Sequence, residues 1–436
     1  MSLGLEPQCQ KRLAEKIAEE LPNVNVENRM FLERHSALEL LSSEPVLPQT
    51  GPLKDLLKQY ISETPIFDFL YGALSRELHQ KQKYDPETPL MKLTELEGYR
   101  DPVSVAQRLV GEFESLPWEY KLSIKLENEF GSLFNQAIKE YAVSDSVKLR
   151  TPDDDFIEKF PLETGIGARD PSSFVGALGL LPIPTPQQWD RESTYFQVKV
   201  KGFVGKYADS APLEDATSLL KAFCGIAIAL RLFKVRYTYR ATPSKAKFFI
   251  HRNTENAWLF EEVHELEASV SDTFSYLVLH DLEGRLDTKE KKLSWMRRQL
   301  QLIRCVLSHQ EKAHKIILGG QWLFDSYCGR NELLSFVQTM VVVEILLGER
   351  AISDLVGLGE LLRNRCAYLI GNSHEERERI LNDFKEIYEV RSKIVHRGKN
   401  RLDINERFLF SRLQWICRRV IQEEVDLLQA DVKKNA

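Results

Sequence analysis

The sequence is poor in the features that mark exported, membrane-spanning and metal-binding proteins. Its longest apolar run, residues 219–233, is interrupted by Lys221 and Arg231 and is too short to span a bilayer. The N-terminal residues include several charges instead of the apolar core of a cleavable signal. The six cysteines are scattered without C-x-x-C spacing, as expected for reduced thiols in a helical core. We therefore expect a cytoplasmic protein with no membrane contact.

Composition excludes further classes of protein. The chain has 436 residues, of which 43% are hydrophobic and 28% are charged, so it is neither fibrous nor disordered. No internal repeat is visible, which argues against a solenoid or a propeller. A chain of this length can form two or three domains with substantial cores.

The chain divides into three regions by residue pattern. Residues 1–165 are expected to be mainly helical, 166–287 to form an α+β domain, and 288–436 to form a long connecting helix followed by a helical bundle. The predicted fold class is α+β, mainly helical: an all-α bundle at the C-terminal end, preceded by an α+β domain with a small antiparallel sheet.

Individual elements follow from periodicity. Helices are expected at residues 9–41, 53–61, 66–79, 103–113, 213–233 and 289–317. Alternation predicts strands at residues 194–204, 235–242, 246–252 and 275–280. The second and third strands are expected to form a hairpin about Pro243-Ser244, and the proline-rich stretch 165–186 to be a loop.

Two groups of residues are candidates for metal binding. Cys305, His309 and His314 fall on the expected helix 289–317, but no fourth ligand is evident. The acidic run 153–155 follows a proline and is expected to start a helix. We expect neither a metal nor another cofactor.

The most informative segment is residues 373–398. Ile380, Phe384, Ile387 and Ile394 recur at helical spacing and define an apolar stripe, and Arg391 falls in the middle of it. A permanently charged group at a core position needs a partner or a functional reason. Arg391 therefore requires an explanation beyond packing.

His396 follows Arg391 by five positions, which places it about 140 degrees further round an ideal helix. The two side chains can meet only if the helix end unwinds or a second chain contributes. Gly398 is typical of a residue just past a helix end, so an unwound end is one of these possibilities. At the other end, Ser373 and Glu376 have the spacing of a capping box.

From about residue 331 the order of segments resembles the HEPN superfamily, specifically its Apea-like branch. The resemblance covers about a quarter of the chain. The first matching helix, residues 333–347, is apolar and carries Glu344, and the second, residues 353–370, carries Arg363 and Arg365. The helix at residues 373–398 bears Arg391-x4-His396, and a last helix at residues 406–428 closes the bundle. Many relatives carry a longer polar residue after the arginine and a glycine after the histidine, whereas this chain has Ser392 and Arg397.

The resemblance implies a metal-independent endoribonuclease that works as a homodimer through the bundle. Residue chemistry agrees, because His396 can exchange a proton near neutral pH and Arg391 can hold a phosphate with its planar fork of donors. One chain supplies one titratable group, whereas cleavage benefits from a base and an acid, so two chains are expected to meet. The expected product carries a 2′,3′-cyclic phosphate.

Local charge is consistent with RNA as the substrate. Residues 391–419 contain nine Lys or Arg against two acids, a local charge of +7 in a chain whose net charge is −5. The predicted substrate-binding residues are Ser392, Lys393, Arg397 and Lys399, with the three cations gripping phosphates.

Other interpretations remain open. Arg391 could be a structural residue paired with Glu344 or Glu332, in a catalytically silent bundle that serves as a dimerisation or nucleotide-binding scaffold. A metal-dependent nuclease using the acidic loops is a third possibility. If the chain is a nuclease, its larger N-terminal part is expected to sense a trigger or restrain the activity, and the α+β region at 166–287 to recognise that trigger or select RNA. The partner would be an unidentified trigger or regulatory protein, and the resemblance implies antiviral defence or a stress response.

Overall fold

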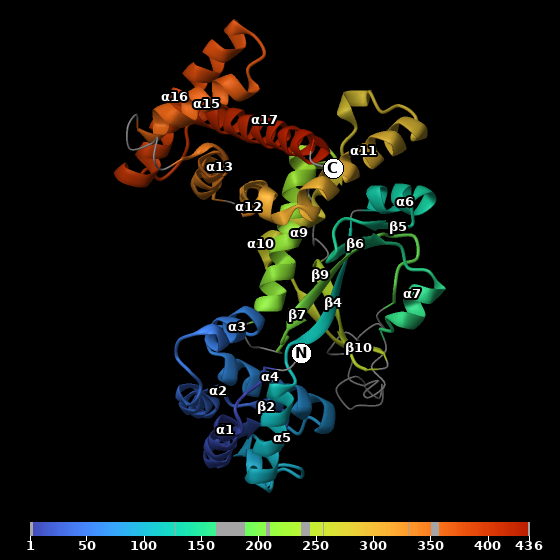
Figure 1. Cartoon of the computed structure of the whole chain (residues 1–436), viewed down its shortest axis with the longest axis vertical. Helices are drawn as coiled ribbons and strands as arrows, with labels where there is room; N and C mark the ends of the chain where they lie inside the picture. The colour runs from blue at the N-terminus through green and yellow to red at the C-terminus, as the bar shows by residue number, and fades with distance from the viewer. Residues whose placement is uncertain are drawn as a thin grey trace.

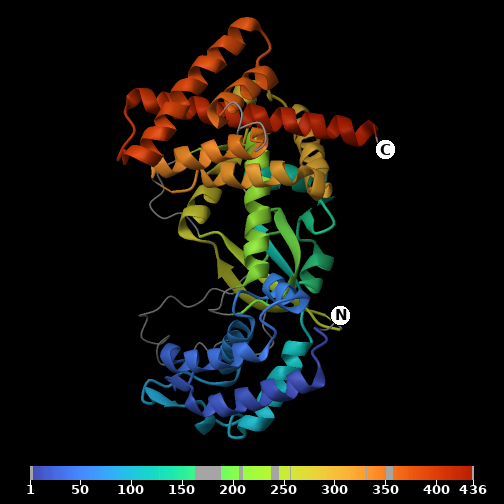
Figure 2. The same cartoon turned by 60° about the vertical axis from the view of Figure 1, so that its left-hand side comes forward.

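A computed structural model describes residues 3–126, 128–162, 188–205, 210–236, 245–255, 257–329, 331–349 and 357–434. N-terminal helices lie at one end of the molecule, a sheet lies in the middle and the C-terminal helices lie at the other end (Figure 1). After a rotation of 60° the last helix is seen running across that far end (Figure 2). The mainly helical α+β fold is therefore as predicted.

The N-terminal part packs helices around a small sheet. Its elements are α1 Pro7–Glu20, η1 Leu21–Asn23, β1 Asn25–Glu27, β2 Phe31–Leu32, α2 Arg34–Ala37, η2 Leu38–Val46, α3 Pro52–Tyr60, α4 Pro65–Lys81, β3 Leu90–Lys92, η3 Leu93–Glu95 and α5 Pro102–Glu114. The prediction of one helical segment over residues 9–41 is wrong, because α1 ends at Glu20 and β1 then pairs with β2 and β3. Pro22 has no N–H with which to continue the helix.

The central sheet has six antiparallel strands in the order β10-β9-β4-β7-β6-β5. The strands are β4 Trp118–Lys125, β5 Glu140–Ala142, β6 Val147–Arg150, β7 Tyr195–Gly202, β9 Lys247–Asn253 and β10 Trp258–Glu265. The sheet thus takes strands from both sides of residue 165. A separate pair joins β8 Phe233–Val235 to β11 Leu277–Leu279.

The strands expected at residues 194–204, 246–252 and 275–280 are present as β7, β9 and β11. Most of the other expected strand of the hairpin, residues 237–242, lies outside the described residues, whereas β9 pairs with β4 and β10, and β8 pairs with β11. The expected turn of the hairpin, Pro243-Ser244, and the proline-rich stretch 165–186 also lie outside the described residues. Local alternation identified the strands but could not choose among long-range partners.

Each face of the six-stranded sheet has its own core. Helix α9, Ala211–Ala229, packs against one face, where β7 contributes Phe196 and Val198. On the opposite face Tyr195 joins an aromatic cluster with Phe156 and Phe160 from the segment around α7, Asp154–Lys159. The acidic run does start this helix, since the Asp153 carboxylate accepts a hydrogen bond from the Phe156 N–H. Two further helices, α6 Asn128–Ala137 and α10 Ala268–Ser275, and the turn η4 Leu282–Gly284 complete this region.

The C-terminal part is all helical. Its helices are α11 Lys289–Ser308, α12 Gln310–Asp325, α13 Glu332–Leu347, α15 Leu358–Ile370, α16 His374–Arg397 and α17 Ile404–Lys434. The single helix expected over residues 289–317 is wrong, because the chain breaks at His309, whose ring Nδ1 lies 2.8 Å from the Cys305 carbonyl oxygen. Cys305 and His314 therefore lie on different helices.

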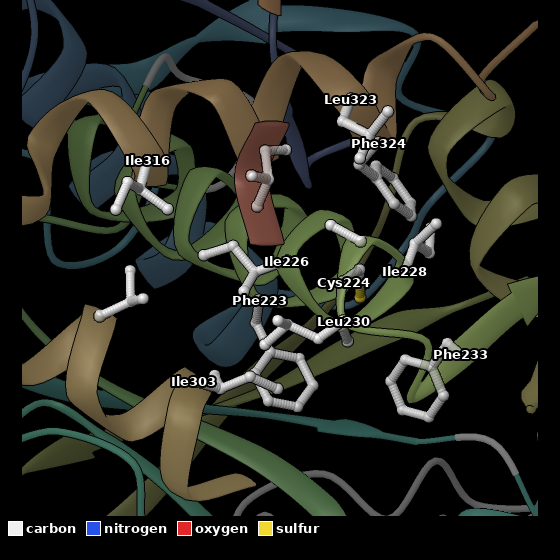
Figure 3. Packing of buried hydrophobic residues seen from close by; sticks show 14 of the residues in the cluster. Phe223, Cys224, Ile226, Ile228, Leu230, Phe233, Ile303, Ile316, Leu323 and Phe324 are labelled. Atoms are coloured by element: carbon white, nitrogen blue, oxygen red, sulfur yellow. The ribbon is translucent and has the colours of Figure 1, made fainter. Parts of the chain in front are cut away.

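Helix α9 connects the sheet to the C-terminal helices. It crosses α12 where Gly225 and Ile226 lie against Gly320. Ile316, Leu323 and Phe324 of α12 lie on one side of α9, and Phe223 points to the other side, toward Ile303 of α11 and Phe233 (Figure 3). As a result one continuous apolar core runs from the sheet into the bundle, whereas the N-terminal helices have a second core. In the described part of the chain, no helix combines the length and apolar character needed to cross a membrane.

Candidate active site at the end of helix α16

Both ends of α16 are capped as the sequence predicted. The Ser373 Oγ accepts a hydrogen bond from the Glu376 N–H at 3.1 Å, and the Glu376 carboxylate accepts one from the Asn372 N–H at 3.0 Å. At the other end Gly398 adopts the left-handed conformation, with φ of 63°. The helix stays regular through Arg397, so its end does not unwind before His396.

Arg391 lies on the side of α16 that faces α13. Ile380, Phe384, Ile387 and Val390 are buried around the same face. The Arg391 Nη2 is 3.6 Å from the Glu344 Oε1, and each side chain is 24% exposed. Both the Arg391 Nε and the Glu344 Oε1 are buried without a hydrogen-bond partner among the described residues, so the contact is ionic and leaves donor and acceptor capacity unused.

The surroundings of Glu344 perturb its protonation. Burial raises the pKa of the Glu344 carboxyl, and the nearby Arg391 guanidinium opposes this shift without cancelling it. Glu332, the other partner considered for Arg391, pairs with Arg407 at 3.1 Å. Among the described residues, the half-buried Arg391 therefore has one carboxylate partner, Glu344 of α13.

His396 lies in the last turn of α16 and is exposed. Because the helix is regular, His396 is displaced from Arg391 by about 140 degrees and by roughly 7.5 Å along the axis. A single chain does not bring the two side chains to one face of the helix. A site containing both requires groups from a second copy, or RNA that wraps around the helix end.

The predicted substrate-binding residues differ in how accessible they are. Lys393 and Arg397 are exposed and have no carboxylate partner in the described part of the chain, while Ser392 is half-buried. Lys399 is held by Glu406 at 2.8 Å, and the Glu406 side chain is only 7% exposed. Lys393 and Arg397 are thus the cations nearest to His396 in sequence that remain available to a phosphate.

The fold neutralises much of the basic segment 391–419. Five of its nine cations pair with carboxylates: Arg391 with Glu344, Lys399 with Glu406, Arg407 with Glu332, Arg412 with Asp383 and Arg419 with Glu423. Arg418 donates to the Gln414 carbonyl oxygen. Lys393, Arg397 and Arg401 remain exposed without such partners among the described residues. The exposed, unpaired positive charge of this segment therefore lies in the last turns of α16 and in the connection to α17.

Three large apolar side chains that the sequence pattern did not single out are exposed near the connection between α16 and α17. Val395 is 47% exposed, and Ile404 and Phe408, one turn apart on α17, are 70% and 71% exposed. Burying such groups against a partner is favourable, and large apolar side chains that stay in water on adjoining helix ends are typical of an association surface. The signal was in the sequence, because Ile404 and Phe408 lie four residues apart among charged neighbours.

The described residues offer little support for other kinds of catalytic site. Within the described ranges, no three His, Cys, Asp or Glu side chains are grouped so that they could hold a metal ion. Burial raises the pKa values of the Cys366 and Cys417 thiols, which disfavours the thiolate needed for nucleophilic chemistry.

Comparison of the chain with models of known families, with curated proteins and with solved structures finds no match. The resemblance to the HEPN superfamily therefore rests on the residues of α13, α15, α16 and α17 described above.

Proposed function

We propose that the chain is a metal-independent endoribonuclease of the HEPN type, with a site formed by His396 and Arg391 of two copies. The exposure of His396 is the observation that carries the proposal. An imidazole that lies on the surface, in the last turn of a capped helix and beside two accessible cations, can reach an RNA backbone. A histidine serving only the core would be buried.

The proposed reaction is transesterification within RNA. The ribose 2′-oxygen forms a bond to phosphorus and the bond from phosphorus to the 5′-oxygen breaks. One His396 takes the proton of the 2′-hydroxyl, and the His396 of the second copy gives a proton to the departing 5′-oxygen. The products are a 2′,3′-cyclic phosphate and a 5′-hydroxyl, with no change in net protonation.

Arg391 would act on the phosphate through its terminal nitrogens. Its ionic contact with Glu344 at 3.6 Å is longer than a charge-assisted hydrogen bond, so other N–H groups of the guanidinium are left to donate to a phosphate. Lys393 and Arg397 would bind neighbouring phosphates. The exposed Val395, Ile404 and Phe408 support the second copy, because burying large apolar side chains near His396 against a partner would be favourable.

Incubating the purified protein with total cellular RNA in the presence of a chelator tests the proposal. We expect cleavage by the wild type, with ends carrying cyclic phosphate. His396→Ala should lower the rate by roughly 100-fold or more, the usual contribution of an acid–base group. Its melting temperature should hardly change, because His396 is exposed.

The matched control is His374→Ala, which removes another exposed histidine at the opposite end of the same helix. This variant should cut RNA like the wild type. Arg391→Lys, which keeps the charge but loses the planar fork, should cut poorly while remaining folded. Undiminished cleavage by His396→Ala would refute the assignment, and cleavage that stops with chelator would indicate a metal-dependent nuclease instead.

The Arg391–Glu344 pair favours one alternative function. An arginine engaged by a carboxylate inside the bundle has a structural role that needs no substrate, as in a catalytically silent dimerisation or nucleotide-binding scaffold. This alternative predicts no turnover of RNA by the wild type under any condition, together with a retained oligomer. The same incubation therefore decides between the two functions.

A further inference from the structure

A second basic surface lies on α11, away from the Arg391 and His396 region. The helix Lys289–Ser308 contains six cations and one acid, Glu290, so its charge is six minus one, or +5, in a chain whose net charge is −5. The cations are Lys289, Lys291, Lys292, Arg297, Arg298 and Arg304. This helix therefore carries a strong local field of the sign that attracts polyanions.

The three arginines of α11 are not neutralised by carboxylates. Arg297, Arg298 and Arg304 are exposed, and none of them pairs with an acid in the described part of the chain. Arg297 donates a long hydrogen bond, 3.4 Å, to the Ala137 carbonyl oxygen, and the Arg304 guanidinium lies 6.0 Å from the centre of the Tyr141 ring. Both contacts hold the side chains against the protein while leaving other guanidinium N–H groups free for an anion.

The lysines of the first turn contrast with these arginines. Lys291 is bound to Asp287 at 2.7 Å and Lys292 to Glu129 at 3.0 Å. Acids are thus available around the start of α11 and are already used by lysines. The cations without a carboxylate partner among the described residues are Lys289 and the three arginines, and arginine matches phosphate better than lysine does.

The arginines share an outward face of the helix. Arg297, Gln301 and Arg304 are spaced at i, i+4 and i+7, with Arg298 adjacent. A surface hollow of about 420 Å³ extends beside them, lined by Glu290, Leu293, Ser294, Arg297, Arg298 and Gln301. A row of guanidinium groups with hydroxyl and amide side chains along it suits the repeating phosphates and sugars of a nucleic acid.

The same face lacks the apolar centre of a protein interface. Among the described residues of α11, no large hydrophobic side chain is exposed, whereas Val395, Ile404 and Phe408 are exposed at the end of α16 and start of α17. Interfaces with proteins normally have an apolar or aromatic core, while nucleic-acid interfaces are polar and positive. Between an acidic protein and a nucleic acid, the composition of this face favours the nucleic acid.

The α11 surface is distant from His396. Helix α11 packs against α6 and α17 at the edge of the molecule, near the C-terminal end of α17 (Figure 1). His396 precedes the opposite end of α17, which begins at Ile404. A helix of 31 residues is about 46 Å long. A ligand on α11 therefore does not occupy the candidate active site, although a long strand could reach both.

We propose that the outward face of α11 is a docking surface for the phosphodiester backbone of a nucleic acid, with Arg297, Arg298 and Arg304 as the phosphate-binding residues. Backbone contacts of this kind hold a strand without selecting its sequence. The surface would supply binding in addition to any cleavage at His396, and it does not depend on the bundle being catalytic.

The test uses the full chain in a His396→Ala background, so that RNA remains intact. The triple variant Arg297→Gln, Arg298→Gln, Arg304→Gln should bind single-stranded RNA at least tenfold more weakly, measured by fluorescence anisotropy. The slope of log affinity against log salt should become shallower by about 2, from roughly 0.7 per lost phosphate contact. Because the three side chains are exposed, the melting temperature should stay within a few degrees.

The matched control removes the same charge from three exposed arginines of the N-terminal part, through Arg12→Gln, Arg34→Gln and Arg100→Gln. This variant should bind RNA as tightly as the His396→Ala parent. Single-stranded DNA of the same sequence and polyglutamate are tested in parallel. RNA binding that is lost in the α11 variant supports the proposal, whether or not DNA behaves alike.

Equal weakening in the control, no weakening in the α11 variant, no RNA binding by the parent, or polyglutamate binding that depends on the same arginines would each overturn the proposal. Cleavage is measured separately with the wild type. Failure of the α11 surface therefore leaves the active-site assignment untouched, and the reverse also holds.

Discussion

Arg391 illustrates how far a single residue can be interpreted from a pattern. Its place within an apolar stripe indicated that the guanidinium needed a partner, and two acids were candidates. Spacing along the chain could not choose between Glu344 and Glu332, because the choice depends on how α13 packs against α16 and α17. The fold selected Glu344, and burial raised the pKa of that carboxyl as a consequence.

His251 is a second buried titratable residue, in the aromatic cluster on the other face of the sheet. Its ring is fully buried between the aromatic rings of Trp189, Phe160 and Phe260. The ring Nε2 lies 2.9 Å from the Pro161 carbonyl oxygen, whereas Nδ1 has no hydrogen-bond partner among the described residues. Burial lowers the pKa of His251 to about 4. The folded protein therefore keeps this imidazole neutral where an unfolded chain would protonate it.

Acid should weaken the fold through His251. Between about pH 6.5 and 4 the unfolded chain binds one more proton at this position than the folded chain, so the free energy of unfolding falls as pH falls, by roughly 3 kcal/mol at about 1.36 kcal/mol per pKa unit. His251→Phe should remove this part of the pH dependence. Urea unfolding at pH 7 and pH 4 measures the difference.

The corresponding control is His35→Phe, at an exposed position of α2. It should keep the acid sensitivity of the wild type. An identical fall in stability for wild type and His251→Phe would show that His251 is not the group responsible.

At the scale of elements, the crossing of α9 and α12 joins the sheet to the bundle. A Cβ atom added at Gly225 would lie 1.8 Å from the Gly320 carbonyl oxygen, and one added at Gly320 would lie 2.8 Å from the Ile226 side chain. Two backbones can approach this closely only without side chains between them. The shared core in Figure 3 depends on this contact.

Gly225→Ala should therefore destabilise the protein by about 3 kcal/mol or more, because the clash is with backbone and cannot be relieved by a rotamer change. Alanine is otherwise the better helix former, so Gly111→Ala, at an exposed position of α5 with nothing within 4 Å of the added Cβ, should stabilise by roughly 0.5–1 kcal/mol. Chemical denaturation of both variants tests the crossing. If both variants changed the free energy of unfolding equally, the close contact between α9 and α12 would not contribute to stability.

At the scale of the whole molecule, a charged contact joins the N-terminal helices to the central sheet. Arg76 of α4 lies 3.2 Å from the Glu261 carboxylate of β10 and also stacks over the Trp118 and Phe203 rings. Glu261 occupies the irregularity in β10 where the register with β9 shifts. The N-terminal helices thus contact β10, the edge strand opposite β5. The C-terminal helices instead pack against the sheet through α9.

The exposed apolar residues Val395, Ile404 and Phe408 should form the contact between two copies of the chain. If two copies meet through Val395, Ile404 and Phe408, Phe408→Glu should convert a dimer to a monomer by placing a charge among these apolar side chains, and RNA cleavage should fall with it. Size-exclusion chromatography with light scattering gives the mass. Leu427→Glu, an exposed apolar position elsewhere on α17, should leave the dimer intact. A monomeric wild type, or a dimeric Phe408→Glu variant, would contradict this interface.

Signals that act within a few residues were sufficient for much of the architecture. The caps of α16, the acidic start of α7, the strand β7 and the division into a mixed region and a helical bundle all follow from neighbouring side chains and backbone groups. The break at His309 was missed, since apolar periodicity continues on both sides of it. The strands β4, β5 and β6 were also missed, because the helical residue pattern of the surrounding segments led to the prediction of a mainly helical region.

Side-chain pattern alone therefore determined the strand β7, the acidic start of α7, where α16 begins and ends, and that Arg391 must have a partner. Tertiary structure alone decided that this partner is Glu344, that β9 pairs with β4, and that five cations of the basic segment are neutralised. The physical reason is range: caps and periodicity depend on residues within one or two turns, whereas strand pairing and ion pairs depend on groups that only folding brings together.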